Sequence, residues 1–283
     1  MLKETTIKLL SALIFLFGIN NVNAQYVSAS SDMDIFDLRF SSSDPAAEVI
    51  WIDDWYGTVT AFAQDTDSGF DDDFNDLLGN NGFINAIAST AHVSSDATYD
   101  VLFGDLIGSD PNADINATTH SDLLLTEKYK QADGLAIADF DNYFVIIGGN
   151  PGDVVEVTFE LDYNGNLKAD ADELGFFEID LASVLAIEDI FGTVMAESFV
   201  FESQSGNNTS VDQDYIGTLA VTTQLFYEEE YWLFAGADAE VYGYTVPEPN
   251  ILLLMISGLG FFFGKRDRFK KLASKKVAKL LMG

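Results

Sequence analysis

The sequence predicts an all-β protein, an antiparallel β-sandwich of a jelly-roll-like kind. Along the middle of the chain, short runs alternate polar with apolar residues, and clusters of Gly, Asn and Asp separate them. Hydrophobic residues make up 48% and aromatic residues 13% of the 283 residues, enough for a large buried core in spite of the acidic composition. Many short strands joined by turn residues favour two packed sheets.

The clearest strand is DVVEVTFEL, residues 153–161. Its apolar residues from Val155 to Leu161 occupy alternate positions, and Glu156, Thr158 and Glu160 lie between them, as in a half-buried antiparallel strand. The preceding Gly-Asn-Pro-Gly, residues 149–152, predicts a tight turn. Similar strand-like runs occupy residues 57–63, 135–137, 143–147, 194–202, 218–226 and 231–244.

Helical patterns are few. Apolar residues recur at helical spacing between residues 70 and 87, but Gly79-Asn80-Asn81-Gly82 interrupts them. Residues 181–190 fit either a short helix or a loop. We therefore expect strands to dominate the body.

The N-terminus has the layout of a secretory signal peptide. Lys3 and Lys8 supply positive charge, residues 9–19 form an apolar stretch of 11 residues, and Val22-Asn23-Ala24 is a small-residue cleavage site. We expect signal peptidase to remove residues 1–24 and to cut between Ala24 and Gln25. The alternative is a buried N-terminal helix. The chain has no cysteine, so neither disulfides nor thiol catalysis are available to it.

The C-terminus contains a three-part pattern. Val246-Pro247-Glu248-Pro249 ends any preceding strand, because proline cannot continue the ladder. An uncharged apolar run, 251–263, follows, and the tail 265–283 then holds eight bases and one acid. Positive charge stays on the cytoplasmic side. Thirteen helical residues rise only about 20 Å, short for a bilayer core, which favours a temporary anchor in the inner membrane.

This pattern resembles the PEP-CTERM sorting signal. The resemblance covers residues 246–283, together with the signal peptide, and it implies export by a Gram-negative bacterium and processing by an exosortase. It also implies residence at the cell surface or in the extracellular matrix, with a link to exopolysaccharide and biofilm. The basic tail is longer than is usual for such signals. The alternative is an ordinary single-pass membrane anchor.

Between these ends, residues 25–245 form the predicted acidic ectodomain. Residues 25–264 contain 44 acids and four bases (Arg39, Lys128, Lys130 and Lys168), a net charge of −40. Nucleic-acid binding is excluded for this portion, because it requires clustered Lys and Arg. Such self-repulsion destabilises a compact state unless bound cations or salt offset it.

Two acidic segments suggest calcium. Residues 162–173 place oxygen donors at positions 1, 3, 5, 9 and 12 of a 12-residue loop, and the donors are Asp162, Asn164, Asn166, Asp170 and Glu173. Two features count against a calcium loop: the glycine is at position 4 where such loops have it at position 6, and position 7 is Lys168. The alternative is a solvated hairpin turn. Residues 65–76 hold six carboxylates, which repel one another without a cation. Calcium is thus the one cofactor that the sequence suggests.

Three functions remain open for the ectodomain. The leading expectation is a non-enzymatic surface or matrix protein. A calcium-dependent glycan- or protein-binding module is the first alternative, since Trp51, Trp55, Tyr56 and Trp232 suit sugar stacking if they are exposed and core packing if they are not. A secreted glycosidase is the second, but 44 acids guarantee chance carboxylate pairs. No nucleophile elbow or histidine metal motif supports catalysis.

Overall fold

The computed structural model describes residues 25–52, 55–78, 81–102 and 113–246. The predictions that concern Ala24, Pro247, Glu248, Pro249, the helix 251–263 and the tail 265–283 lie outside these residues. Within the described ranges, no helix is long and apolar enough to cross a membrane.

The described chain forms thirteen β-strands. They are β1 (Val27–Ser42), β2 (Glu48–Trp51), β3 (Tyr56–Asp65), β4 (Gly69–Leu78), β5 (Asn81–Ser89), β6 (Val93–Leu102), β7 (Ala113–Leu125), β8 (Gln131–Ile147), β9 (Val154–Ala171), β10 (Gly175–Asp189), β11 (Val194–Gly206), β12 (Thr209–Phe226) and β13 (Glu230–Thr245). Six of the seven strand-like runs of the sequence lie wholly within these strands, and the seventh, 153–161, begins one residue before β9.

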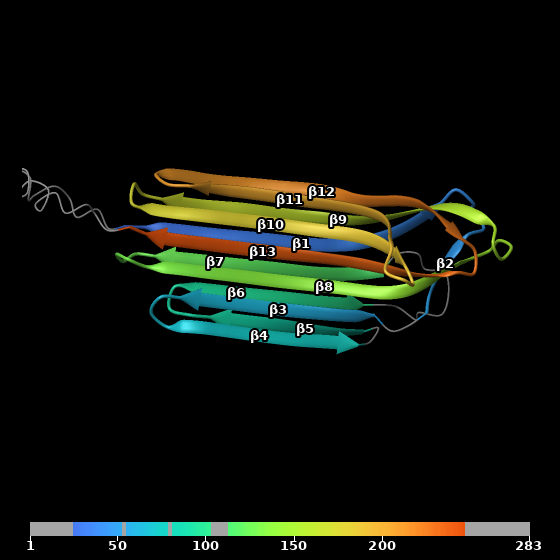
Figure 1. Cartoon of the computed structure of the whole chain (residues 1–283), viewed down its shortest axis with the longest axis horizontal. Coiled ribbons are helices and arrows are strands. Elements are labelled where there is room, and N and C mark those ends of the chain that lie inside the picture. Colours follow the sequence, from blue (N-terminus) through green and yellow to red (C-terminus); the bar gives the residue numbers. More distant parts are fainter. Residues whose placement is uncertain (1–24, 53–54, 79–80, 103–112, 247–283) are drawn as a thin grey trace, which may run out of the picture. The chain divides into compact units, whose positions relative to one another are not determined.

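The strands make two antiparallel sheets, which lie over one another in Figure 1. Sheet A has the order β12-β9-β1-β7-β6-β5, and sheet B has the order β11-β10-β13-β8-β3-β4, with the short β2 added to β8. At one side of the molecule β11 and β12 are the edge strands, and at the other side β4 and β5 are. The predicted all-β fold of antiparallel sheets is confirmed.

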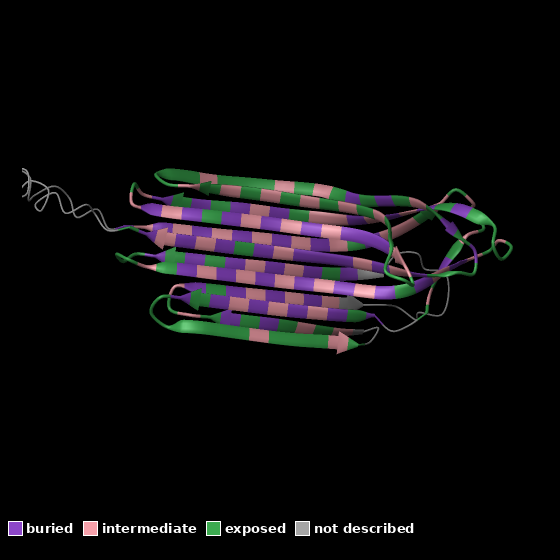
Figure 2. Cartoon of the chain, viewed as in Figure 1, coloured by how far each residue is buried: buried purple, intermediate pink, exposed green. Residues whose placement is uncertain are grey.

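The core lies between the two sheets because the strands alternate buried with more exposed residues (Figure 2). In β9, Val155, Val157, Phe159 and Leu161 are all buried, as predicted. The centre of the core is aromatic: Phe144 packs its ring 5.1 Å from that of Phe159, centroid to centroid. Period-two alternation therefore determines which side chains enter the core.

The two helical alternatives are wrong. Residues 70–78 fall in β4, residues 81–87 fall in β5, and residues 181–189 belong to β10. In β4 the apolar residues at helical spacing do not mark a buried face, since Phe74 is 58% exposed. In β10, Leu181, Leu185 and Ile187 are buried at odd positions, which is the period of a strand.

Candidate functional site

The predicted calcium loop is not a loop. Residues 162–171 continue β9, in register with β1 on one side and β12 on the other. Asp162, Asn164, Asn166 and Asp170 are even-numbered and lie along the outer face of sheet A, whereas Glu173 follows the end of the strand. Asp162 and Asp170 are eight residues apart, about 25 Å in an extended strand, so these donors do not surround one ion. The loop prediction is therefore wrong.

Asp162 instead pairs with Arg39. The guanidinium donates from Nη1 to Asp162 Oδ2 and from Nη2 to Oδ1, both at 2.6 Å, and Nε donates to Glu160 Oε2 at 3.4 Å. A bulge in β1 makes this possible: Asp37 adopts a φ of 56°, and the register shifts between Phe36 and Arg39. Without that shift the odd-numbered Arg39 would face the core. The arginine holds the pKa of Asp162 below its usual range.

The second acidic segment also has structural roles. On β4, Asp71 accepts a hydrogen bond from the Ser89 amide at 2.8 Å, and Asp73 accepts one from the Ile87 amide at 3.1 Å. Asn75 Nδ2 donates to the carbonyl of Asn85 at 2.6 Å. Alternate side chains of β4 thus bind alternate backbone groups of β5 in one constant antiparallel register. We call these three contacts the edge zipper.

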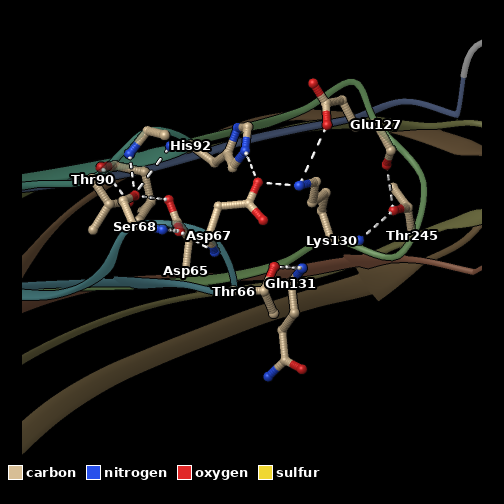
Figure 3. Close-up of polar contacts among 12 residues, drawn as sticks. Asp65, Thr66, Asp67, Ser68, Thr90, His92, Glu127, Lys130, Gln131 and Thr245 are labelled. Atoms are coloured by element: carbon tan, nitrogen blue, oxygen red, sulfur yellow. Dashed lines mark hydrogen bonds and ion pairs between the residues drawn. The ribbon is translucent and has the colours of Figure 1, made fainter.

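The acids that precede β4 organise one end of the sandwich (Figure 3). Asp65 accepts hydrogen bonds from the amides of Asp67 and Ser68, which hold its pKa far below the usual range in spite of burial. The Asp67 carboxylate bonds to Lys130 Nζ and lies 3.3 Å from His92 Nε2. These acids are therefore partnered within the protein. Across the described part of the chain, no group of three or more His, Asp or Glu residues is placed to hold a metal ion.

Both ends of the folded body lie at this same end of the sandwich (Figures 1 and 3). Thr245 closes β13: its amide donates to the Lys130 carbonyl at 2.8 Å, and its hydroxyl donates to the Glu127 carbonyl at 2.6 Å. At the start of the body, the Tyr26 amide donates to Asp172 at 3.1 Å. The residue after Thr245, Val246, is 39% exposed.

The four aromatic residues that the sequence singled out divide into two pairs. Trp55 is fully buried, and Trp51 packs on it with 4.6 Å between ring centroids, so both belong to the core. Tyr56 and Trp232 are instead on the outer face of sheet B. For Trp51 and Trp55 the core-packing alternative is therefore the correct one, because Trp55 is enclosed between the sheets and Trp51 packs against it.

Trp232 lies within a larger aromatic surface. It stacks on Tyr143 of β8 with 6.4 Å between centroids, and Phe234 is 6.0 Å away on its own strand. Tyr56 on β3 lies opposite Asp141, and Glu188 on β10 lies opposite Trp232. We call Tyr56, Tyr143, Trp232 and Phe234 the aromatic patch. Sequence reasoning missed Tyr143 and Phe234, although both follow the period-two spacing of their strands.

Next to the aromatic patch, the outer face of sheet B is hollowed. A depression of about 290 Å³ is lined by apolar residues of β10 and β11 and by carboxylates; the lining includes Val184, Phe199, Phe201, Asp139, Asp238 and Glu197. Gly236 forms part of it, and the Asp139 carboxylate lies so close that a Cβ there would meet it at 2.2 Å. Aromatic rings, an apolar hollow and carboxylates thus meet on one face.

The carboxylates of this face are costly to ionise. Burial, reinforced by Asp238 and Asp141, raises the pKa of Asp139 to about 6. Burial also raises the pKa of Asp133, Asp141, Asp238 and Glu240. Within the described strands of sheet B, none of the body's four bases lies at an outward position.

The contribution of Asp139 to stability should therefore fall as the pH rises. The pKa of Asp139 is higher in the folded than in the unfolded state, so its ionisation opposes folding progressively from about pH 4 to about pH 6. We expect Asp139→Asn to raise the free energy of unfolding at neutral pH by about 1–2 kcal/mol and to flatten its pH dependence. Urea denaturation across this range measures both. The exposed Asp72→Asn changes the net charge equally, so an equal gain there would contradict the prediction.

His120 is a second candidate, on sheet A. Its Nδ1 bonds to Asp32, and its Nε2 lies 2.7 Å from Asp122 Oδ2. Hydrogen bonds with Asp122 and Asp32 raise the pKa of His120 to about 10, so the imidazolium persists at neutral pH. A histidine held in this state with both nitrogens engaged neither accepts a proton nor ligates a metal, and we interpret it as a cation that offsets its acidic neighbours.

Comparisons with known proteins identify no family. No family model matches the chain. No curated protein matches it either. Among solved structures, the infectious bursal disease virus VP2 subviral particle is similar at 11% identity and a TM-score of 0.13, over 88% of this chain and 76% of that one. Acinetobacter baumannii OccAB4 is similar at 8% identity and a TM-score of 0.09, over 78% of this chain and 100% of that one. Likenesses this weak carry no argument.

Proposed function

We propose that the chain is an exported, non-enzymatic cell-surface or extracellular-matrix protein with a jelly-roll-like ectodomain. Residues 1–24 act as its signal peptide, and residues 246–283 act as a PEP-CTERM-like sorting signal read by an exosortase. In transit, the apolar helix 251–263 holds the protein in the inner membrane of a Gram-negative bacterium, with the basic tail on the cytoplasmic side. The ectodomain is then released to the surface or matrix, where it associates with exopolysaccharide.

The boundary at Thr245 carries this proposal. The last strand is fixed by hydrogen bonds up to Thr245, and the Val-Pro-Glu-Pro motif begins at the next residue. Val246, the first residue of the motif, follows the last strand and is 39% exposed, which suits recognition of the motif without unfolding of the body. The first residue after the predicted cleavage, Gln25, lies just before β1 at the same end of the sandwich. This arrangement suits a body tethered from one end.

Removal of residues 247–283 should abolish sorting. We expect a tagged chain without them to lose its inner-membrane stage and to accumulate as soluble periplasmic protein. A matched variant, Pro247→Ala with Pro249→Ala, keeps the helix and the tail, so it should remain in the membrane fraction, uncleaved. Fractionation and immunoblotting measure both. Unchanged surface delivery of the truncated chain would refute the sorting role.

The aromatic patch supports a second function, glycan binding. Stacked rings beside carboxylates suit sugar binding. The aromatic rings pack on the apolar faces of sugar rings, and the carboxylates accept hydrogen bonds from the sugar hydroxyls. Trp232 and Tyr143 stack beside Glu188 and Asp141 on an open face of sheet B. Because the calcium loop is absent, the binding proposed here does not require calcium.

Substitution of the patch tests this second function. We expect Tyr143→Ala with Trp232→Ala to weaken binding to exopolysaccharide by about 10-fold or more, since each stacking contact contributes about 1 kcal/mol. Binding should be unaffected by EDTA. Phe74→Ala removes a ring that is 58% exposed on the same sheet outside the patch and should change nothing. Equal binding by all variants would refute the role, and release of reducing ends would indicate a glycosidase instead.

A further inference from the structure

The two side edges of the sandwich differ in how they are protected. At one edge, the edge zipper joins β4 to the backbone of β5, so the uncharged β5 is covered by Asp71, Asp73 and Asn75. At the other edge, β12 pairs only with β9. Among the described residues, side-chain hydrogen bonds to the β12 backbone occur only at Gln213 and Phe226. Within the part of the chain that the structure describes, no other strand and no side-chain hydrogen bond covers the central backbone of β12.

The exposed part of β12 is also unusual in composition. Residues 216–226, IGTLAVTTQLF, contain no charge and no proline, in a chain whose net charge is −32. Ile216 is 78% exposed. Edge strands normally carry charges, proline or bulges, because a row of free N–H and C=O groups templates pairing with another strand. A long uncharged edge strand without these devices is suited to bind a further strand.

We propose that β12 is the self-association edge of this protein, where residues 216–226 pair antiparallel with the same residues of a second copy. Pairing about a two-fold axis at Val221 joins the two six-stranded sheets A into one sheet of twelve strands. A second copy fits because residues 216–226 carry no charge, so two copies of this segment can lie side by side without repulsion between their own side chains. In this register Asp212 and Asp214 lie opposite Glu230 and Glu228 of the second copy, so their repulsion limits the paired stretch to residues 216–226.

The surrounding charge predicts how association responds to salt. The acids that flank the segment repel their counterparts, and at 0.1 M ionic strength exposed charges more than about 10 Å apart are largely screened. Association should therefore strengthen with salt, the opposite of a dimer held by ion pairs. The inference goes beyond the proposed function and does not depend on it, since sorting can fail while the edge still pairs.

The absence of cysteine gives a clean test. Full-length chains in a mild non-ionic detergent, with single substitutions Ala220→Cys and Thr222→Cys, are oxidised alone and mixed, at two protein concentrations. Pairing centred on Val221 places position 220 of one copy opposite position 222 of the other, so the mixture should form disulfide dimers about tenfold faster than Ser94→Cys, an exposed control on β6. Dimers no faster than this control would overturn the proposal.

A charged variant provides an independent measurement. Ala220→Lys with Thr222→Lys places like charges opposite each other across the two-fold axis, yet it makes the net charge less negative. We expect it to be monomeric by sedimentation and to lose the concentration-dependent amide protection of residues 216–226 that the native chain shows. If the native chain is monomeric in high salt, the proposal is wrong. Protection that is independent of protein concentration would assign the edge to a different occupant and would equally overturn it.

Discussion

Trp55→Ala should cost the protein about 3–5 kcal/mol of unfolding free energy, the usual range when a large buried aromatic is removed. Trp55 is 0% exposed, and its ring centroid lies 4.6 Å from that of Trp51 and 5.7 Å from that of Phe140. Removal of the indole ring leaves a cavity in the aromatic cluster between the two sheets. The surrounding strands cannot collapse into this cavity, because hydrogen bonds hold them in register. Urea denaturation followed by circular dichroism measures the loss.

Trp232→Ala is the matched control. Trp232 is only partly buried on the outer face of sheet B, so its loss should cost about 1 kcal/mol. The same pair of variants separates stability from recognition. Trp55→Ala should be strongly destabilised and keep its glycan affinity while folded, whereas Trp232→Ala should lose little stability and bind glycan more weakly. Equal destabilisation by the two variants would contradict the assignment of Trp55 to the core.

Arg39→Met should cost about 2 kcal/mol at neutral pH, the range for charged hydrogen bonds that solvent partly screens. The substitution removes both 2.6 Å contacts with Asp162 and leaves that carboxylate and Glu160 adjacent without a cation. Because Arg39 lowers the pKa of Asp162, the pair stabilises the fold above the ordinary carboxylate pKa and its contribution is lost as the pH falls. The difference in stability between native and variant proteins should therefore shrink progressively as the pH falls below about 4.

Lys168→Met is the control for charge alone. Lys168 lies on the same face of sheet A, 3.8 Å from Asp212, and its side chain is 65% exposed. Such an open pair contributes between about 0 and 1 kcal/mol, so this variant should remain near native stability. If both variants lose the same amount, the effect comes from net charge and not from the geometry around Arg39.

The calcium prediction failed for a reason within the pattern itself. Loop ligands at positions 1, 3, 5 and 9 share one parity, and residues of one parity also share one face of a strand. Asp162, Asn164, Asn166 and Asp170 fit both descriptions, and spacing cannot distinguish them. Pairing with β1 and β12 on both sides decides in favour of the strand. Glu173, the one donor of the other parity, falls beyond the strand end at Ala171.

The second acidic segment shows what a linear sequence conceals. Six carboxylates in residues 65–76 indicate repulsion and a need for cations when only near neighbours are considered. The fold gives several of them partners from distant strands: Asp67 binds Lys130, and Asp71 and Asp73 accept amides of β5. Those partners depend on which strands become edges, and strand order is a property of the assembled sheets.

By itself, the sequence determined the all-β class, the inward face of β9 and the charge of the body, because alternation and composition act locally along the chain. Tertiary structure decided which tryptophans enter the core, that Asp162 meets Arg39, that four rings gather beside Asp141, and that β5 is covered while the described chain leaves β12 open. Each of these depends on contacts between residues far apart in sequence, which only the packing of two sheets creates.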